Sequence, residues 1–562
     1  MNRIDCVNLF ALGIIRVLFL SKKLIKSGLI VSAMTLLSRV LGLVRDVVIA
    51  NVMGAGVMAD VFLFANKIPN FFRRLFAEGA FAQAFVPVLS EYHTRDEKKT
   101  DKSDQKSEGI EQTNIAVSLD ETRRLIAQVS GTLGVIITLV TLFGMLASPL
   151  FVILFGGGWF VDWFNNGPDS VGGEKFELAA SLLKITFPYL WFISFTALAG
   201  AVLNTMGRFA VAAFTPVLLN IVIILMAIYG AQYTQSPAYA LAWGVFFGGL
   251  IQFLFQIPFL YKANVLVKPC WSWHSDGVIK IRKLIIPALF GVSVTQINLL
   301  LDTLIASFLI TGSISWLYYA DRLLEFPLGL FGIGIATVIL PSLSKLHSKN
   351  DPKQFAATLD WGIRVISLFG WPALAGLMIL AQPIIMVLFM RGEFSQTDVL
   401  QVSMALFAYL SGLLSFMFIK VLAPGYYARQ DTKTPVKIGI KSMVANMAFN
   451  LMLAPFFGYV GLAIATTMSA TLNAWLLYRG LKQAGIYHLS KSTKIFISKL
   501  ILAASVMALV VYQLSYDFDV WLLMSFVEQI SQLVLCIGVG CLSYFLVIFL
   551  LGVRLNDFKV KS

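Results

Sequence analysis

Long apolar segments recur along nearly the whole chain, and they constrain its fold more than any other feature. A helix needs about 20 mainly apolar residues to cross the hydrocarbon core of a bilayer. By this criterion the sequence contains fourteen candidate spans, so it predicts an all-α polytopic membrane protein. The spans are residues 26–50, 58–89, 125–155, 176–204, 212–231, 238–261, 284–310, 314–344, 356–388, 398–424, 436–456, 459–478, 495–515 and 522–551.

Composition agrees with a membrane protein and excludes most other classes. Of the 562 residues, 58% are hydrophobic and only 13% are charged, against about 45–50% and about 25% in soluble domains. This excludes a soluble enzyme, a disordered scaffold and a disulfide-rich secreted module. The four Cys and four His lack the spacing of a disulfide framework or a zinc site, so no metal chemistry is expected. The net charge of +14 records orientation rather than binding to nucleic acid.

Basic residues outside the spans gather in alternate connections. The opposite set of connections contains only Lys175 and Arg391. Basic loops stay in the cytoplasm, so both termini are predicted to be cytoplasmic, and these two residues are predicted to lie on the external side. The connection 91–124 mixes nine acidic with seven basic residues and is predicted to be a solvated cytoplasmic loop.

An internal repeat divides the chain into two parallel lobes of six helices, followed by two C-terminal helices. The run from Asp46 to Gly56 closes the first span as the run from Asp302 to Gly312 closes the seventh. Two further short motifs repeat in the same order. Parallel repeats are typical of transporters, with the substrate site between the lobes. The predicted organisation is an N-terminal extension over 1–23, an N-lobe over 24–262, a C-lobe over 263–484, and two further spans with a tail over 485–562.

Charged residues inside the spans indicate the chemistry of the cargo. Such residues are costly in a membrane and usually face the bundle interior. Arg39, Arg45 and Arg322 lie well inside their spans, and Ser38 shares a helix face with Arg45. Guanidinium stays charged when dehydrated and binds phosphate oxygens in pairs. These residues predict a cationic cavity between lobes for a phosphate or pyrophosphate that is carried and not cleaved. The alternative is that the arginines pair with nearby acids or reach the headgroups.

A second polar set lies apart from the arginines. Asp302, Asn446, Asn450 and Thr466 all offer oxygen atoms, which are the ligands that a hard cation such as Na⁺ prefers. The alternative is hydrogen bonding between helices, which is common for Asn and Thr in bundles.

Several long motifs carry a family resemblance. The runs Ser32–Asp46 (SAMTLLSRVLGLVRD), Lys67–Phe81 (KIPNFFRRLFAEGAF), Trp316–Pro327 (WLYYADRLLEFP) and Leu422–Pro435 (LAPGYYARQDTKTP) are similar to the MurJ (MviN) lipid II flippase family, within the multidrug/oligosaccharidyl-lipid/polysaccharide exporter superfamily. The match extends from about residue 24 to the C-terminus. The first 21 residues and part of the 91–124 connection resemble additions.

The resemblance implies a specific cargo and specific residues. Members of the family move lipid II, the undecaprenyl-pyrophosphate-linked disaccharide-pentapeptide, from the inner to the outer leaflet of the bacterial cytoplasmic (inner) membrane for peptidoglycan synthesis. The last two spans would flank a groove for the lipid tail. The family's cavity arginines match Arg39, Arg45, Arg73 and Arg322, and its cavity acids match Asp46, Asp60 and Glu325.

The resemblance also extends to the second polar set. Some relatives are similar in having a sodium site at these positions, with a carbonyl at the residue that matches Leu462. The expected protein is therefore a monomeric transporter rather than an enzyme, without a cofactor other than Na⁺ as a coupling ion. Its expected partners are lipid II, membrane lipids and the peptidoglycan synthesis machinery.

Other functions stay open from the residues alone. A flippase for another polyprenyl-linked oligosaccharide would need similar arginines. A cation-coupled drug exporter would instead want an acidic or aromatic cavity, and a membrane-embedded enzyme would need an acid/base or metal-binding cluster. Either a cation gradient or the membrane potential would drive transport.

Overall fold

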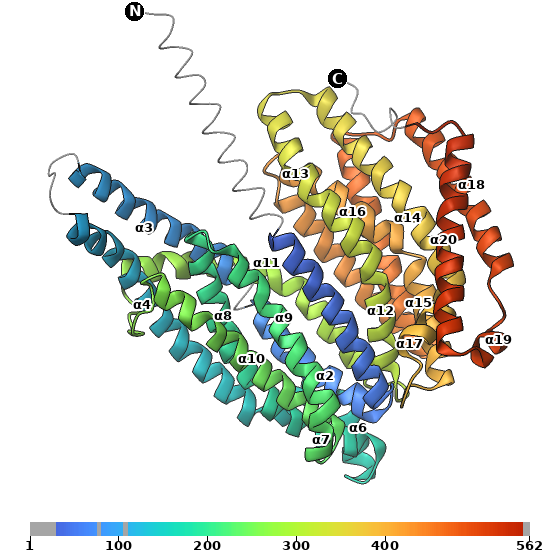
Figure 1. The fold of residues 1–562 in the computed structure, drawn as a ribbon, viewed down its shortest axis with the longest axis horizontal. Helices are drawn as coiled ribbons and strands as arrows, with labels where there is room; N and C mark the ends of the chain where they lie inside the picture. The colour runs from blue at the N-terminus through green and yellow to red at the C-terminus, as the bar shows by residue number, and fades with distance from the viewer. Residues whose placement is uncertain (1–29, 76–79, 105–110, 555–562) are drawn as a thin grey trace, which may run out of the picture. The chain divides into compact units, whose positions relative to one another are not determined.

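The computed structural model describes residues 30–75, 80–104 and 111–554, and these form helices joined by short connections, without a β-strand in the described ranges. The predicted N-terminal extension over 1–23 lies outside them. Figure 1 shows the helices, coloured along the chain from the N-terminus to the C-terminus. Contacts divide the chain into two units. Of the described residues, the first unit contains those within 30–49, 65–152 and 177–296, and the second contains those within 50–64, 153–176 and 297–554.

Helices of the first half of the chain supply the first unit, and some of them end in the second. They are the helix over 30–53, α2 (Val57–Arg73), α3 (Ala80–Asp104), α4 (Glu111–Leu146), α5 (Ser148–Phe155), α7 (Val171–Thr186), α8 (Pro188–Thr205), α9 (Phe209–Leu225), η2 (Met226–Gly230), η3 (Ala231–Tyr233), α10 (Pro237–Lys262) and α11 (Asp276–Ala306).

The second unit contains the remaining helices. They are α6 (Gly157–Asn166), α12 (Ser313–Pro327), η4 (Leu328–Gly332), α13 (Ile333–Ser348), α14 (Pro352–Phe389), α15 (Gln396–Leu410), α16 (Leu413–Tyr427), α17 (Lys433–Gln483), α18 (Lys491–Leu514), α19 (Phe518–Leu523) and α20 (Phe526–Leu550). The two units do not follow the sequence repeat exactly, because residues 50–64 and 153–176 of the first half pack with the second half. The division into lobes stays a prediction.

The helices are long and apolar enough for a multi-pass membrane protein. Among the described residues, nine helices are long and apolar enough to cross a membrane. The number is ten if α15 and α16, which meet at 41°, form one span. Helix α17 contributes one helix to that total. It has 51 residues, which gives a length of about 77 Å at 1.5 Å per residue. Gly458 interrupts it with a φ of 57° and a ψ of −138°, so α17 consists of two helical segments that meet at this residue. The predicted total of fourteen spans stays a prediction.

The connection 91–124 is not a loop as predicted, since helices occupy most of it. Helix α3 continues to Asp104 and α4 begins at Glu111. Charged residues such as Glu, Lys and Arg are good helix formers, so a polar sequence here extends the helices beyond the spans. Asp96 joins the two helices by accepting hydrogen bonds from the amide (3.2 Å) and hydroxyl (2.6 Å) of Thr122.

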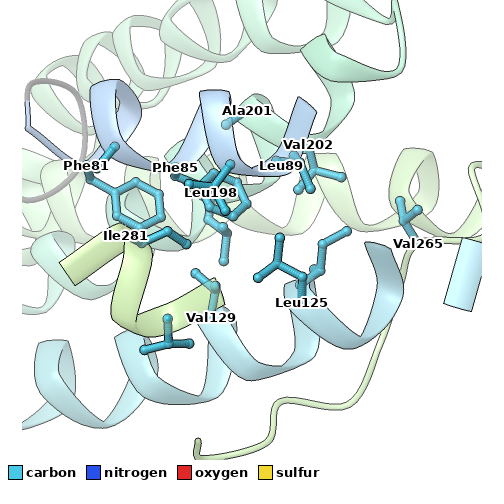
Figure 2. Packing of buried hydrophobic residues seen from close by; sticks show 14 residues of the cluster. Phe81, Phe85, Leu89, Leu125, Val129, Leu198, Ala201, Val202, Val265 and Ile281 are labelled. Carbon is cyan, nitrogen blue, oxygen red and sulfur yellow. The ribbon is translucent and has the colours of Figure 1, made fainter. Parts of the chain in front are cut away.

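Helix α11 reaches the same end of the first unit. Lys280 donates a hydrogen bond to Glu91, and this contact lowers the pKa of the exposed Glu91 carboxyl. Between these helices lies an apolar core (Figure 2), with side chains from α3, α4, α8 and α11. The rings of Phe81 and Phe85 stack there with centroids 5.2 Å apart. The core holds the ends of these four helices together.

In the second unit, α18 and α20 pack on each other and on α14. Small residues let the backbones approach, as is common between membrane helices. Ala503 and Ala504 are buried in this contact, and a Cβ added at Gly540 would lie 2.8 Å from Val511. The last two spans are therefore part of the second unit rather than a separate appendage.

Candidate functional site

Arg45 is the best-connected arginine of the first span. Its Nη2 lies 2.7 Å from the carboxylate of Asp46, which is buried. Its Nη1 donates to the side-chain oxygen of Asn220 on α9 (3.1 Å), and the Asn220 amide donates in turn to the carbonyl of Ser38 (3.1 Å). Asn220 thus contacts both Arg45 and the backbone of Ser38, two residues that were predicted to share a helix face. The alternative reading, pairing with a nearby acid, is also correct for Arg45, although 16% of its side chain remains exposed.

Arg39 differs from Arg45 in having an exposed side chain. Within the described residues it makes no recorded hydrogen bond or ion pair. It lies six residues before Arg45 on the same helix. An exposed guanidinium within an apolar helix retains all five of its donors for an incoming anion.

Arg73 is the last residue of α2, and Arg74 directly follows it. Arg73 is half-buried and donates from Nε to the side chain of Asn70 (3.0 Å). Arg74 is exposed and donates to the side chain of Gln296 on α11 (3.1 Å). The two side chains thus have different partners, as expected for neighbours on a helix.

In the second unit, Arg322 and Glu325 lie on α12. The Nη1 of Arg322 lies 2.9 Å from the Glu325 carboxylate, with 37% and 52% of the two side chains exposed. Tyr318, one turn earlier, accepts a hydrogen bond from Nη2 (3.2 Å), and its ring centroid lies 4.8 Å from the guanidinium carbon. Tyr318 and Glu325 thus hold an arginine that is still accessible.

Asp60 belongs to α2, and its environment differs from that of the arginines. Its side chain is buried against the beginning of α12. One of its oxygens accepts from the amide of Gly312 (2.7 Å), and the other accepts from the amide (3.0 Å) and hydroxyl (2.7 Å) of Ser315. The Nζ of Lys175 lies 3.3 Å away. A carboxylate at the N-terminus of a helix is stabilised by the free amides and the helix dipole. We call these four residues the Asp60 cluster.

Lys175 was not predicted as a site residue. Its side chain is 4% exposed and also lies over the ring of Trp159, at 5.5 Å. The sequence did contain a signal, since Lys175 is one of only two basic residues in the connections predicted to be external. A buried lysine there needs a carboxylate partner, and Asp60 is that partner.

Hydrogen bonds to backbone carbonyls next to the Asp60 cluster also join the first and second halves of the sequence. The amide of Glu393 donates to the carbonyl of Asn51 (2.9 Å), and the hydroxyl of Tyr319 donates to the carbonyl of Gly54 (3.2 Å). Gly54 has a φ of +61°, and a Cβ there would lie 2.4 Å from the Glu393 carbonyl oxygen. The end of the first span and the second half of the chain are therefore in direct contact.

The second polar set comes together as predicted, between α11 and the two halves of α17. Asn450 donates to Asp302 (2.6 Å) and to Asn446 (3.0 Å). Thr466 donates to the carbonyl of Leu462 (2.9 Å) and accepts from Asn446 at 3.5 Å. Asn298, which was not predicted, donates to Asp302 at 3.4 Å.

The chemistry of this set fits a hard cation. Every predicted member offers an oxygen atom, and only Asp302 carries a formal charge. Asn450 is buried, and its side-chain oxygen is without a hydrogen-bond partner within the described part of the chain. A buried acceptor left unpaired is costly, and a bound cation would satisfy it. The hydrogen bonds between helices that formed the alternative interpretation are present as well.

Comparison with known proteins identifies the family of the chain. Residues 49–531 match the family described as "Lipid II flippase MurJ". The "Probable lipid II flippase MurJ" of Vibrio cholerae is 60% identical over 543 residues, covering 96% of this chain and 99% of the relative. A solved structure described as "Lipid II flippase MurJ, inward closed conformation" is 28% identical, with a TM-score of 0.72, and the match covers 92% of this chain and 98% of that one.

A more distant solved structure shares the fold. It is an inward-facing multidrug resistance MATE family transporter of the MOP superfamily, with a TM-score of 0.62 at 14% identity, and the match covers 81% of this chain and 97% of that one.

Proposed function

Because the chain belongs to the MurJ family of lipid II flippases, we propose that it carries lipid II from the inner to the outer leaflet of the bacterial cytoplasmic membrane. It is a transporter and not an enzyme. The observation that carries the proposal is the set of arginines within apolar helices, which suits a lipid pyrophosphate. The proposed phosphate ligands are Arg39, Arg45, Arg73 and Arg322.

The acidic partners have distinct proposed roles. Asp46 and Glu325 orient Arg45 and Arg322 through the ion pairs at 2.7 and 2.9 Å. A guanidinium is planar and rigid, so an ion pair on one edge fixes the orientation of the whole group. Ser38 supports the same arrangement through Asn220.

Asp60 has a structural role in this proposal rather than a direct contact with the cargo. Its oxygens are occupied by Gly312, Ser315 and Lys175. Transport by alternating access requires that contacts between the two halves of the chain form in one state and break in another. The Asp60 cluster is such a contact, and we propose that it holds one side of the pathway closed until the cargo is bound.

We also propose that Na⁺ binds at Asp302, Asn446, Asn450, Leu462 and Thr466. The support is the all-oxygen set and the unpaired oxygen of Asn450. When bound, the ion would supply positive charge beside Asp302 and tie α11 to both halves of α17. A difference in ion affinity between two states would couple transport to the ion gradient.

Complementation in a strain depleted of its own flippase tests the proposal. Wild type should restore growth, and the variant with Arg39, Arg45 and Arg322 each replaced by Ala should not, at equal protein levels in the membrane. Arg479→Ala is a matched control, because this exposed arginine lies over Trp475 at the end of α17. Full growth with the triple variant would contradict the proposed cargo site. A monomer with both termini in the cytoplasm, working beside the peptidoglycan synthesis machinery, completes the proposal.

A further inference from the structure

A basic pocket of about 370 Å³ lies at the beginning of α18, against α14 and the chain that follows α20. Three basic residues line it: Arg364, Lys491 and Lys499. Ser492 and the apolar side chains of Ile495 and Phe496 also line the pocket. None of these residues belongs to the proposed cargo or ion site.

Arg364 is held in place by a hydrogen-bonded cluster. Its side chain, 16% exposed, lies 3.2 Å from the Asp360 carboxylate. It also donates to the hydroxyls of Thr493 (2.6 Å) and Ser492 (3.0 Å). Asp360 accepts further hydrogen bonds from Tyr487 and Ser490. Because Arg364 offsets the charge of Asp360, the two lysines leave the pocket with excess positive charge.

The beginning of α18 adds hydrogen-bond donors to that charge. The Ser490 hydroxyl accepts a hydrogen bond from the amide of Thr493 (3.1 Å). The amides of Lys491 and Ser492 lie in the first turn, so they have no acceptor within their own helix. A helix N-terminus favours anions, phosphate above all. Lys499 is fixed to the end of α20 by donating to the carbonyl of Leu551 (2.8 Å), and its ammonium has two further donors. Charge, donors and a cavity therefore coincide.

An apolar stripe runs from this pocket along an exposed side of α18. Ile495, Leu502 and Leu509 follow at intervals of seven residues, so they share one face of the helix, and 50%, 52% and 61% of their surfaces are exposed. Such a stripe below a phosphate-binding pocket matches the acyl chain of a phospholipid. A soluble phosphate would make no use of it.

We propose that this pocket binds the phosphate of an anionic phospholipid, whose acyl chain lies on the stripe formed by Ile495, Leu502 and Leu509. The basic ends of the spans face the cytoplasm by the positive-inside rule, so the lipid belongs to the inner leaflet. Basic pockets at the cytoplasmic ends of membrane helices are a recurrent form of lipid-headgroup site. The site does not depend on the proposed cargo.

Native mass spectrometry of the purified full-length protein tests this, with phosphatidylglycerol titrated against phosphatidylcholine. The variant Lys491→Gln/Lys499→Gln should lose roughly thirtyfold in phosphatidylglycerol affinity, because each basic residue contributes about fivefold at an anionic surface. Lys482→Gln/Lys494→Gln is the matched control, since it removes the same charge from exposed positions outside the pocket and should bind as wild type does. Lys491→Gln alone, at an exposed position, should lose about fivefold and serves if the double variant does not fold.

A separate arm distinguishes the source of the phosphate. Inorganic phosphate in large excess should not displace phosphatidylglycerol if the acyl chain contributes to binding. Displacement by inorganic phosphate would overturn the lipid assignment. Three results would overturn the site itself. They are equal affinity for the two lipids, unchanged affinity in the Lys491→Gln variants, and the same loss of affinity in the control variant.

Discussion

The Nζ of Lys175 lies 3.3 Å from the Oδ2 of Asp60, and both side chains are at most 4% exposed. The two residues are 115 positions apart, and the carboxylate also accepts hydrogen bonds from the beginning of α12. A buried charge without its partner is strongly unfavourable. This pair therefore links three segments of the chain in one cluster, and the cluster cannot open without rehydrating both charges.

The pair predicts a strong thermodynamic coupling. Asp60→Asn should destabilise the protein by about 3–5 kcal/mol because it leaves the Lys175 ammonium buried without a counter-charge. In the double variant Asp60→Asn/Lys175→Met that unpaired charge is gone, so the two losses should not add. Equilibrium unfolding in detergent measures the cycle, and a coupling of more than about 0.5 kcal/mol is expected for residues in direct contact. Strict additivity would contradict the account.

Arg322 should require its guanidinium rather than only its charge. Its N–H groups are divided between Glu325, the hydroxyl of Tyr318 and the proposed anion. Lysine keeps the charge but cannot bind in this forked manner, so Arg322→Lys should reduce transport at least tenfold, and Arg322→Ala should abolish it. Initial rates of lipid II translocation provide the measurement. A Lys variant as fast as wild type would mean that the contact is a simple charge.

Stability in Na⁺ should depend on Asp302. If the ion binds the folded protein, raising Na⁺ should raise the melting temperature, since a ligand stabilises the state that binds it. Asp302→Asn removes the only formal charge of the set and should abolish the shift. Potassium at the same ionic strength is the control for salt effects. An equal Na⁺ shift in wild type and variant would remove the ion site and leave the cargo site unaffected.

Gly458 should be required for the break within α17. Its φ is +57° and no atom lies within 4 Å of an added Cβ, so Gly458→Ala tests conformation without a clash. We expect a loss of about 1–3 kcal/mol, the cost of holding an L-residue in a backbone region that is essentially restricted to Gly. Gly439→Ala is the matched control, because this residue is helical in the same element and equally uncrowded, and there Ala should be neutral or stabilising. Equal effects on unfolding would argue against the break.

The sequence predicted the helical class and the pairing of distant polar residues better than it predicted boundaries. Asp302 and Asn450 are 148 positions apart, yet oxygen chemistry alone grouped them. The connection 91–124 was misjudged because polarity was taken to mean a loop, whereas charged residues also extend helices into water. The boundary between the spans predicted over 436–456 and 459–478, by contrast, coincides with the break at Gly458.

The Asp60 cluster shows a different limit. Charge counting identified Lys175 as an exception on the predicted external side, but it could not supply the partner. That partner depends on tertiary packing, which brings the beginning of α2, Lys175 and the beginning of α12 together. Asn220 and Asn298 were missed for a similar reason, since a lone Asn in an apolar helix has no distinguishing pattern until its neighbour is known.

Reconstituted translocation of lipid II is the decisive measurement of whether the arginines carry the cargo. Purified protein in vesicles that contain lipid II should expose the headgroup on the opposite leaflet, measured by the access of a membrane-impermeant probe. The account predicts transport by wild type and by Arg479→Ala, and none by the variant with Arg39, Arg45 and Arg322 replaced by Ala. Translocation by this triple variant at the wild-type rate would contradict it.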